Sequence, residues 1–162
     1  MAVLKLHLDE FNEIDYELIA IHSSLEDYRL AYFLNQKLPI ILSKSKKLIE
    51  VHSKFGAVLF AQFTFRDASN DIEWFLVQNK NESIVRKRST VQNLFFDKDV
   101  EIETKIFLLS EYKKVDYFLK IDNNQNNLII ENVIKEIKTI PNVTAVYAVN
   151  PNHIKSKNNL IF

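Results

Sequence analysis

The chain is built around Leu109-Ser110-Glu111-Tyr112-Lys113-Lys114-Val115-Asp116-Tyr117, a nine-residue segment. A similar segment lies near the start of the chain, at Leu8-Asp9-Glu10-Phe11-Asn12-Glu13-Ile14-Asp15-Tyr16. Four aligned positions are identical, and two more exchange Phe for Tyr and Ile for Val. Each copy lies between two apolar segments of strand character, and a helix-like segment follows each of them. This similarity predicts an internal duplication.

The segments around the two copies show the periodicities of strands and helices. Alternating apolar residues predict strands at 3–8, 16–21, 102–109, 117–121 and 143–149. Apolar residues three and four positions apart predict a helix over 127–139, which Pro141 ends. An equivalent helix is expected over 25–37, with Pro39 after it and Ser23 and Ser24 as caps. Its expected buried positions are Leu25, Tyr28, Tyr32 and Leu38.

Two apolar segments, 58–65 and 72–78, lie between the halves and predict a hairpin at the centre of the sheet or beneath a helix. Another strand is expected at 46–51. We therefore predict an α+β fold in a single domain over residues 1–162, with an antiparallel sheet and two helices on one face. Two β-β-α-β pseudo-repeats would occupy about 1–55 and 101–162, and residues 56–100 would be an inserted hairpin plus loop.

Composition excludes several classes of site. The chain lacks cysteine, which excludes disulfides and thiolate nucleophiles, and its single glycine, Gly56, is too little for a phosphate-binding glycine loop. Its 21 Lys and Arg residues balance 21 Asp and Glu residues, so its overall charge does not favour nucleic acid as a partner. The histidines lack the spacing of metal ligands. We expect a cytoplasmic protein without metal, cofactor, signal peptide or membrane span.

The second copy of the repeated segment resembles the signature of the IPExxxVDY proteins, a bacterial family of the Bacteroidetes. Glu111 and Val115-Asp116-Tyr117 match that signature, whereas Leu109-Ser110 stands in place of its Ile-Pro. The family has about the length of this chain, so the resemblance extends over the whole sequence. It implies a small cytoplasmic protein with no assigned activity, cofactor or catalytic residue.

The first candidates for chemistry are the motif residues of the two copies: Glu10, Asp15, Tyr16, Glu111, Val115, Asp116 and Tyr117. Their carboxylates would form acid/base couples, or a cation site shared by the two halves. The alternative is structural: Glu accepts hydrogen bonds from loop N–H groups, Asp anchors a strand start, and Tyr packs across a hairpin. We favour the structural interpretation, because an active site rarely needs two intact copies.

The other candidates lie in residues 79–99, where the periodicity is weakest. Arg86, Lys87 and Arg88 form a basic cluster that would contact a phosphate or an RNA backbone, with Phe95 and Phe96 as stacking surfaces. The alternative is a solvated loop balanced by the acidic residues that follow it. If Phe95 and Phe96 are exposed, they would instead mark a site for a protein partner.

Three functions therefore remain open, and we favour the first. The chain would be a non-enzymatic cytoplasmic binding or adaptor protein with a protein partner. It would otherwise be an RNA-associated accessory factor that uses the basic cluster. The third possibility is a small-molecule-binding regulatory module, with its ligand between the two halves and the motif carboxylates at the edge. No residue spacing indicates a reaction, so catalysis is not predicted.

Overall fold

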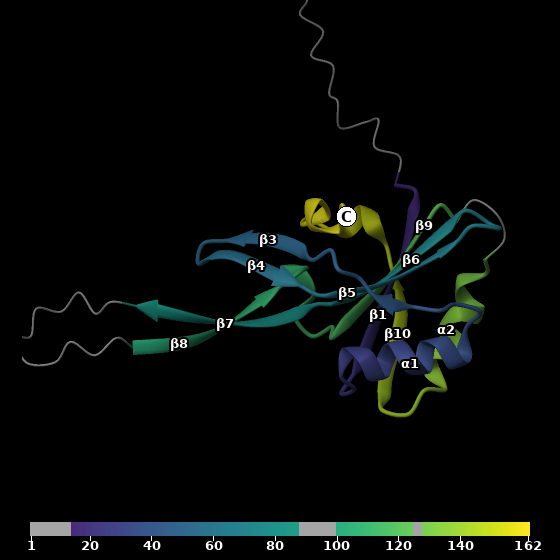
Figure 1. The fold of residues 1–162 in the computed structure, drawn as a ribbon, viewed down its shortest axis with the longest axis horizontal. Helices are drawn as coiled ribbons and strands as arrows, with labels where there is room; N and C mark the ends of the chain where they lie inside the picture. The colour runs from purple at the N-terminus through teal and green to yellow at the C-terminus, as the bar shows by residue number, and fades with distance from the viewer. Residues whose placement is uncertain (1–13, 88–99, 125–127) are drawn as a thin grey trace, which may run out of the picture.

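The computed structural model describes residues 14–87, 100–124 and 128–162. Within these ranges the largest element is a six-stranded antiparallel sheet, in the order β10-β1-β9-β6-β5-β2 (Figure 1). Its strands are β1 (Tyr16–Ser23), β2 (Ser43–Lys44), β5 (Gln62–Asp67), β6 (Ile72–Gln78), β9 (Tyr117–Asp122) and β10 (Val143–Val149). The helices α1 (Asp27–Lys37) and α2 (Ile130–Lys138) follow β1 and β9. The predicted α+β class and antiparallel sheet are confirmed.

The strands β10-β1-β9-β6 and the two helices form a split β-α-β topology. After β1 the chain passes through α1 before it reaches β6, and after β9 it passes through α2 to β10. In both cases another strand lies between the two that are connected, which is the arrangement of ferredoxin-like sheets. The strands that directly follow the two motif copies, β1 and β9, are therefore neighbours at the centre of the sheet. They pair from Tyr16↔Asp122 to Ile21↔Tyr117.

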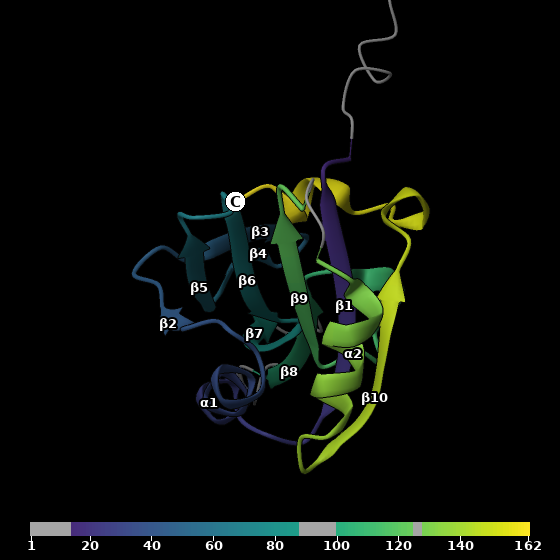
Figure 2. The same ribbon diagram turned by 90° about the vertical axis from the view of Figure 1, so that its right-hand side faces the viewer.

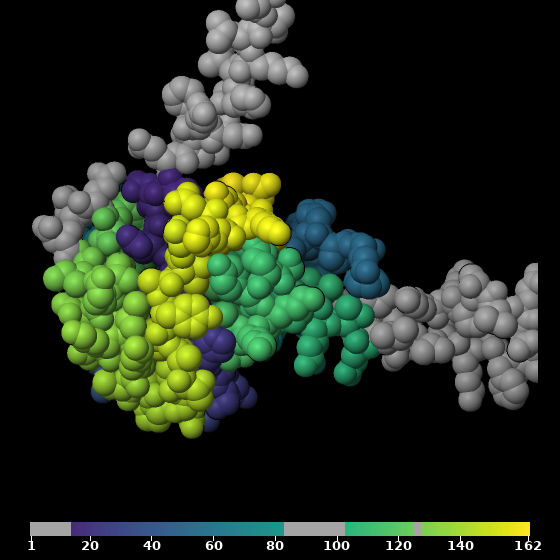
Figure 3. All heavy atoms as spheres, turned by 180° about the vertical axis from the view of Figure 1, so that it is seen from behind, coloured from purple at the N-terminus to yellow at the C-terminus, as the bar shows by residue number. Residues whose placement is uncertain are grey.

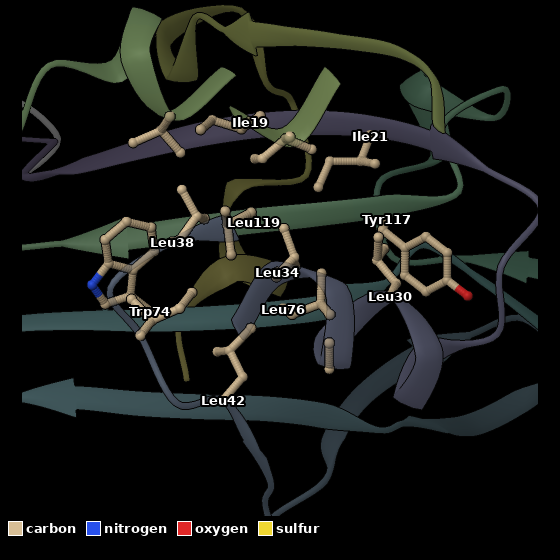
Figure 4. Close-up of a cluster of buried hydrophobic side chains, with 14 of the residues drawn as sticks. Ile19, Ile21, Leu30, Leu34, Leu38, Leu42, Trp74, Leu76, Tyr117 and Leu119 are labelled. Carbon is tan, nitrogen blue, oxygen red and sulfur yellow. The ribbon is translucent and has the colours of Figure 1, made fainter. Parts of the chain in front are cut away.

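Both helices pack on one face of this sheet, which buries what we call the helix-side core (Figures 2 and 4). Successive strand residues point to opposite faces, so every second residue of β1 and β9 meets the helices. The fully buried members include Ile19, Ile21, Leu30, Leu34, Leu119 and Ile137. Burying a side chain of this size contributes about 1.5–3 kcal/mol.

The other face is covered by a hairpin and by the C-terminal segment, residues 150–162, which together bury the hairpin-side core. The hairpin joins β3 (Ile49–Ser53) to β4 (Gly56–Phe60). Gly56 completes its turn with a φ of 112°, a conformation that costs glycine little. Phe60 and Leu160 pack there with Phe118 of β9. Figure 3 shows the C-terminal segment, in yellow, from behind.

A two-stranded ribbon, β7 (Lys80–Lys87) with β8 (Val100–Phe107), extends away from the sheet (Figure 1). Strand β7 follows β6 in the chain, and only Asn79 lies between β6 and β7. Gln78 pairs with Tyr117 of β9, whereas Lys80 pairs with Phe107 of β8. The first part of 79–99 is therefore a regular strand, although its periodicity did not predict one.

Helix α1 begins later than predicted, and the predicted capping box is wrong. The helix starts at Asp27, and no side chain in the described part of the chain caps it. The hydroxyl of Ser23 instead donates to Asn142 O (2.9 Å) and accepts from Leu25 N (3.1 Å). Ser23 thus joins the end of β1 to the loop before β10.

The buried face of α1 was also predicted only in part. Leu25 and Leu38 are buried, as expected, but Tyr28 and Tyr32 are 59% and 60% exposed. The helix instead turns Leu30, Ala31 and Leu34 toward the sheet. The two tyrosines therefore lie on the outer surface of the molecule.

The predicted strand at 58–65 consists of two strands in different sheets. The β4 part pairs with β3. The β5 part pairs with β6, and a turn at 68–71 joins these two strands. Leu59, expected at the centre of a sheet, is 50% exposed, because β4 faces a core on one side only. Near the end of the chain a 3-10 turn occupies Lys157–Leu160.

The internal duplication remains a prediction. In the motif alignment Tyr16 corresponds to Tyr117, but their side chains lie on opposite faces of the sheet. Tyr16 packs against the hairpin-side core and Tyr117 belongs to the helix-side core. Leu18 and Leu119, which align two residues later, are divided between the cores in the same way. Residues 3–8, Glu10 and most of the first copy lie outside the described residues.

Candidate functional site

Asp116 joins three strands at the point where β9 begins. Its Oδ2 accepts a hydrogen bond from Ser23 N at the end of β1 (2.9 Å), and its Oδ1 pairs with Lys80 Nζ at the start of β7 (2.7 Å). Its own N–H donates to Ile21 O (3.2 Å). Both carboxylate oxygens are thus engaged with the protein itself.

Asn79 is fully buried and holds the loop formed by residues 109–115, which we call the motif loop. Its Nδ2 donates to Tyr112 O and to Val115 O, each at 2.9 Å, and its Oδ1 accepts from Leu109 N at 2.9 Å. Its backbone bonds to Leu108 N and Asp116 O, both at 2.8 Å. One side chain therefore bonds to three backbone groups of the loop, two of them in fully buried hydrogen bonds. Nothing in the sequence pattern identified this residue.

Glu111 binds the C-terminal segment. Its Oε1 accepts from Lys155 N (2.7 Å) and Ser156 N (3.0 Å), and its Oε2 accepts from Ser156 Oγ (2.7 Å). Burial raises the pKa of this carboxyl group, but the hydrogen bonds from Ser156 and Lys155 outweigh burial and bring the pKa to about 2. Glu111 is therefore ionised at neutral pH and holds the segment that covers the hairpin-side core.

Tyr117 and Val115 complete the second motif copy as buried residues. The Tyr117 hydroxyl donates to Leu25 O in the loop before α1, at 2.6 Å. Burial, with the nearby carboxylates Asp27, Asp116 and Glu26, raises the pKa of Tyr117 to about 12. The hydroxyl is thus a hydrogen-bond donor over the physiological range, and it fixes the entry to α1.

Several predicted site residues have no described side chain. Arg86 and Lys87 belong to the backbone of β7, but their side chains are outside the described part of the structure. Arg88, Phe95 and Phe96 lie wholly outside the described residues. Asp15 is exposed and Tyr16 is half-buried. Glu10 lies outside the described residues, so a cation site shared by the motif carboxylates stays a prediction. The predictions for the basic cluster and for Phe95 and Phe96 remain predictions.

Lys120 is a buried cation in the central strand β9, and only 5% of its surface is exposed. Its Nζ lies 3.0 Å from Asp122 Oδ2. It also lies 5.1 Å from the ring centroid of Tyr16, 5.2 Å from that of Phe75 and 4.7 Å from that of Phe162. Aromatic faces attract a cation at such distances. The sequence of β9 indicates that this position is buried, because Lys120 lies two residues after the buried Phe118 and therefore on the same face of the strand.

The outer face of α1 carries an aromatic patch made of Tyr28, Arg29, Tyr32 and Phe33, which we call the tyrosine patch. These four residues line an open, mainly apolar hollow of about 500 Å³. Tyr28 and Tyr32 are four residues apart and therefore adjacent on the helix surface. Phe33 is half-buried against the helix-side core, and its ring meets that of Tyr32 edge to face at 5.6 Å.

A second hollow, of about 430 Å³, lies between the β3–β4 hairpin, β8 and the motif loop. Its lining includes the cations Lys54, Lys105 and Lys113, together with His52 and Phe55. Lys54 Nζ lies 5.0 Å from the Phe55 ring centroid. The hollow lies beside the start of the β7–β8 ribbon, whose backbone includes Arg86 and Lys87.

Within the described ranges, no three His, Asp or Glu side chains are close enough to hold a metal ion. None of the helices there has both the length and the apolar character to cross a bilayer.

No protein-family model, no curated protein and no solved structure matches this chain.

Proposed function

We propose that the chain is a non-enzymatic binding protein that docks a protein partner through the tyrosine patch on α1. The observation that carries this proposal is the exposure of Tyr28 and Tyr32, at 59% and 60%, on the face of α1 that points away from the sheet. Tyrosine and arginine are enriched among the residues that dominate binding energy at protein interfaces. A partner with an apolar surface and a carboxylate for Arg29 fits this patch.

The patch is held rigidly, which favours binding. Leu30, Ala31 and Leu34 fix the opposite side of α1 in the helix-side core. The Tyr117 hydroxyl fixes the loop before the helix through Leu25 O. A partner would then lose little affinity to the ordering of α1, since preorganised surfaces avoid that entropic cost.

The hydrogen bonds of the motif residues support a structural role for them. The Glu111 carboxylate is engaged with the C-terminal segment, that of Asp116 with β1 and β7, and the Tyr117 hydroxyl with the loop before α1. The residues that match the IPExxxVDY signature would then belong to the scaffold of the binding protein, and the resemblance implies a cytoplasmic location for it. Membership of that family and the location are part of the proposal.

Affinity capture with paired variants tests the proposal. Tagged wild-type protein, Tyr28→Ala/Tyr32→Ala and the control Ile41→Ala/Ile161→Ala would be incubated with native extract, with and without nuclease. The control removes two side chains that are 73% and 78% exposed elsewhere on the surface. A protein that wild type and control recover with nuclease present, and that the tyrosine variant loses at least tenfold, supports the proposal. Equal recovery by all three refutes the patch as the docking site.

A second candidate function is binding to RNA, favoured by the basic lining of the hollow beside the ribbon. Lys54, Lys105 and Lys113 would contact phosphates there, and Phe55 offers a ring for a base. Fluorescence anisotropy with a labelled single-stranded RNA at low and high salt tests it. Binding that falls steeply with salt and is lost in Lys54→Gln/Lys105→Gln/Lys113→Gln would favour this candidate. No binding at low salt would exclude it.

A further inference from the structure

Strand β10 forms one edge of the six-stranded sheet and lies at the right-hand border of the sheet in Figure 2. On its inner side it pairs with β1, from Leu18↔Val149 to Ser23↔Val143. On its outer side it pairs with no strand that the structure describes. Every second residue of an edge strand directs its backbone N–H and C=O groups away from the sheet. The outer side of β10 therefore offers hydrogen-bond donors and acceptors to another extended strand.

The two edges of the sheet differ in how they are protected against strand pairing. The opposite edge, β2, has only two residues and ends at Lys44, with Lys46 two positions later. Short edge strands and lysines are common devices that prevent pairing with another chain. Strand β10 has seven residues, Val-Thr-Ala-Val-Tyr-Ala-Val, without a charged residue, proline or glycine. Its register with β1 shifts near its start and is regular from Ala145 to Val149.

The side chains of β10 leave room for a neighbouring strand. Thr144 and Ala148 are small and exposed. Tyr147 is 41% exposed, but its hydroxyl oxygen lies 3.1 Å from His22 Nε2 on β1, and the two ring centroids are 5.6 Å apart. The Tyr147 side chain is thus directed toward β1 and away from the outer side of the strand.

A second copy of β10 fits this edge. A two-fold axis perpendicular to the sheet makes two copies of one edge strand antiparallel and continues the sheet from one copy into the other. Each charge near such an axis meets the same charge of the other copy, which is destabilising. The edge avoids this repulsion, because residues 139–152 include no Lys, Arg, Asp or Glu.

Helix α2 is compatible with this pairing. It packs on β10, and in Figure 2 its ribbon does not extend beyond that strand. The two-fold axis would place both α2 helices on the same face of the sheet, side by side and antiparallel. Glu131 in the first turn of one helix would then lie toward Lys138 in the last turn of the other. Such exposed charge pairs orient two copies more than they stabilise them.

We propose that β10 pairs antiparallel with the β10 strand of a second copy of this chain, so that the two sheets become one continuous sheet. The tyrosine patch lies on α1 and takes no part in this contact. The proposal is therefore independent of the protein-binding function.

Sedimentation equilibrium of the full-length protein tests the proposal, with wild type measured from about 1 to 100 µM. We expect a dimer. Thr144→Lys/Ala148→Lys should raise its dissociation constant at least tenfold, because four lysines would then line one two-fold contact. The matched control is Ser43→Lys/Ala57→Lys, which adds the same charges at exposed positions of β2 and β4. This control should dimerise as wild type does.

Spin labels locate the contact, because the chain has no cysteine and a single Cys variant therefore carries one label per copy. Labels on Ala148→Cys should lie within about 30 Å of each other, since strands are about 4.8 Å apart and rise about 3.3 Å per residue. Labels on Ser43→Cys, at the opposite edge, should lie more than about 40 Å apart. Pulsed electron paramagnetic resonance measures both distances.

Three results would overturn the proposal. The first is a wild-type protein that stays monomeric over the whole concentration range. The second is a Thr144→Lys/Ala148→Lys variant that dimerises as tightly as its control. The third is a dimer in which the labels on Ala148→Cys are farther apart than those on Ser43→Cys. If the lysine variant at the β10 edge does not fold, the wild-type measurement and the label distances still decide.

Discussion

At the scale of single residues, Asn79 is the side chain on which the motif loop depends most. Asn79 itself has no solvent contact, and its side chain bonds to Leu109 N, Tyr112 O and Val115 O. Asn79→Leu keeps the approximate volume but leaves Leu109 N and Val115 O unpaired, whereas Tyr112 O still accepts from Val115 N at 3.0 Å. We expect it to lower the free energy of unfolding by about 3 kcal/mol or more, since each unpaired buried group costs about 1–3 kcal/mol. Urea denaturation followed by circular dichroism measures this.

The control for Asn79→Leu is Asn158→Leu, at an exposed position of the C-terminal segment. A change of less than about 0.5 kcal/mol is expected there, as for most surface substitutions. If Asn79→Leu is as stable as this control, the hydrogen bonds of Asn79 contribute nothing to the fold.

The ionisation of Glu111 makes the free energy of unfolding depend on pH. Its pKa is about 2 in the folded protein, against 4.5 for an unperturbed carboxyl group. A lowered folded-state pKa stabilises the fold above the unfolded-state pKa, and this contribution is lost as the pH falls from about 4.5 to about 2. We expect Glu111→Gln to be less stable at pH 7 and to show a shallower fall in that window. Urea midpoints measured from pH 2 to pH 7 test this.

Glu131→Gln, on the outer surface of α2, makes the same change of charge and should keep the wild-type slope. A Glu111→Gln slope identical to wild type would mean that the bonds to Lys155 and Ser156 do not form in solution.

Single residues differ in how far the sequence could place them. Lys120 lies two positions after Phe118 in a regular strand, so alternation already places it on a buried face. Asn79 lies between β6 and β7, and Gln62 is the first residue of β5; both are buried, although the neighbouring pattern does not determine burial at such positions. Their roles depend on contacts with Val115 and with Lys47, which folding brings together. Such contacts leave no local signal.

At the scale of elements, α1 shows why a helix can be predicted and its buried face missed. Tyr28 and Tyr32 form one apolar stripe at helical spacing, and Leu30 and Leu34 form another on the opposite side. Helix period alone does not choose between two such stripes. Packing on the sheet favours the leucines, which fill the space above Ile19 and Leu119. Unlike tyrosine, leucine carries no hydroxyl group that would need a hydrogen-bond partner in the core.

Paired substitutions in α1 test this assignment. Leu34→Ala should lower the free energy of unfolding by about 3 kcal/mol, because it opens a cavity in the helix-side core. Tyr32→Ala, two residues away and 60% exposed, should change it by less than about 0.5 kcal/mol. Thermal and urea denaturation of both variants provide the comparison. A larger loss for Tyr32→Ala than for Leu34→Ala would mean that α1 packs with its tyrosines inward.

Strand boundaries were predictable where the next turn is polar. The polar turn after β5 and the segment 143–149 agree with the sequence pattern. The division of 58–65 into β4 and β5 was not predictable, because the residues on both sides of the break are apolar. Val58 and Phe60 face the hairpin-side core from the covering hairpin, while Phe63 belongs to the helix-side core. The apolar character of the sequence continues across this break, although the partner strand changes.

At the scale of the whole molecule, the two motif copies illustrate the difference between sequence similarity and structural equivalence. A shift of one residue in a strand moves every side chain to the other face. The alignment pairs residues 101 positions apart, whereas β1 and β9 residues that share a face, such as Ile19 and Leu119, are separated by an even number. An alignment cannot detect this, because β1 and β9 are apolar on both faces.

The two cores share the strands of one sheet, and we therefore expect them to unfold together. Trp74, the single tryptophan, is buried in the helix-side core, while Leu160 is buried in the hairpin-side core. Leu160→Ala should lower the free energy of unfolding by about 3 kcal/mol. Because β6 and β9 contribute to both cores, the urea midpoint from Trp74 fluorescence should fall as far as that from circular dichroism.

Ile161→Ala is the matched control for this experiment, because the neighbouring Ile161 is 78% exposed and should leave both midpoints unchanged. Suppose instead that Leu160→Ala lowers the circular dichroism midpoint and leaves the Trp74 transition at its wild-type position. The hairpin and the C-terminal segment would then unfold from a sheet that keeps its helices. Coincident shifts mean that the C-terminal segment, held by Glu111, stabilises the helix-side core through the strands between them.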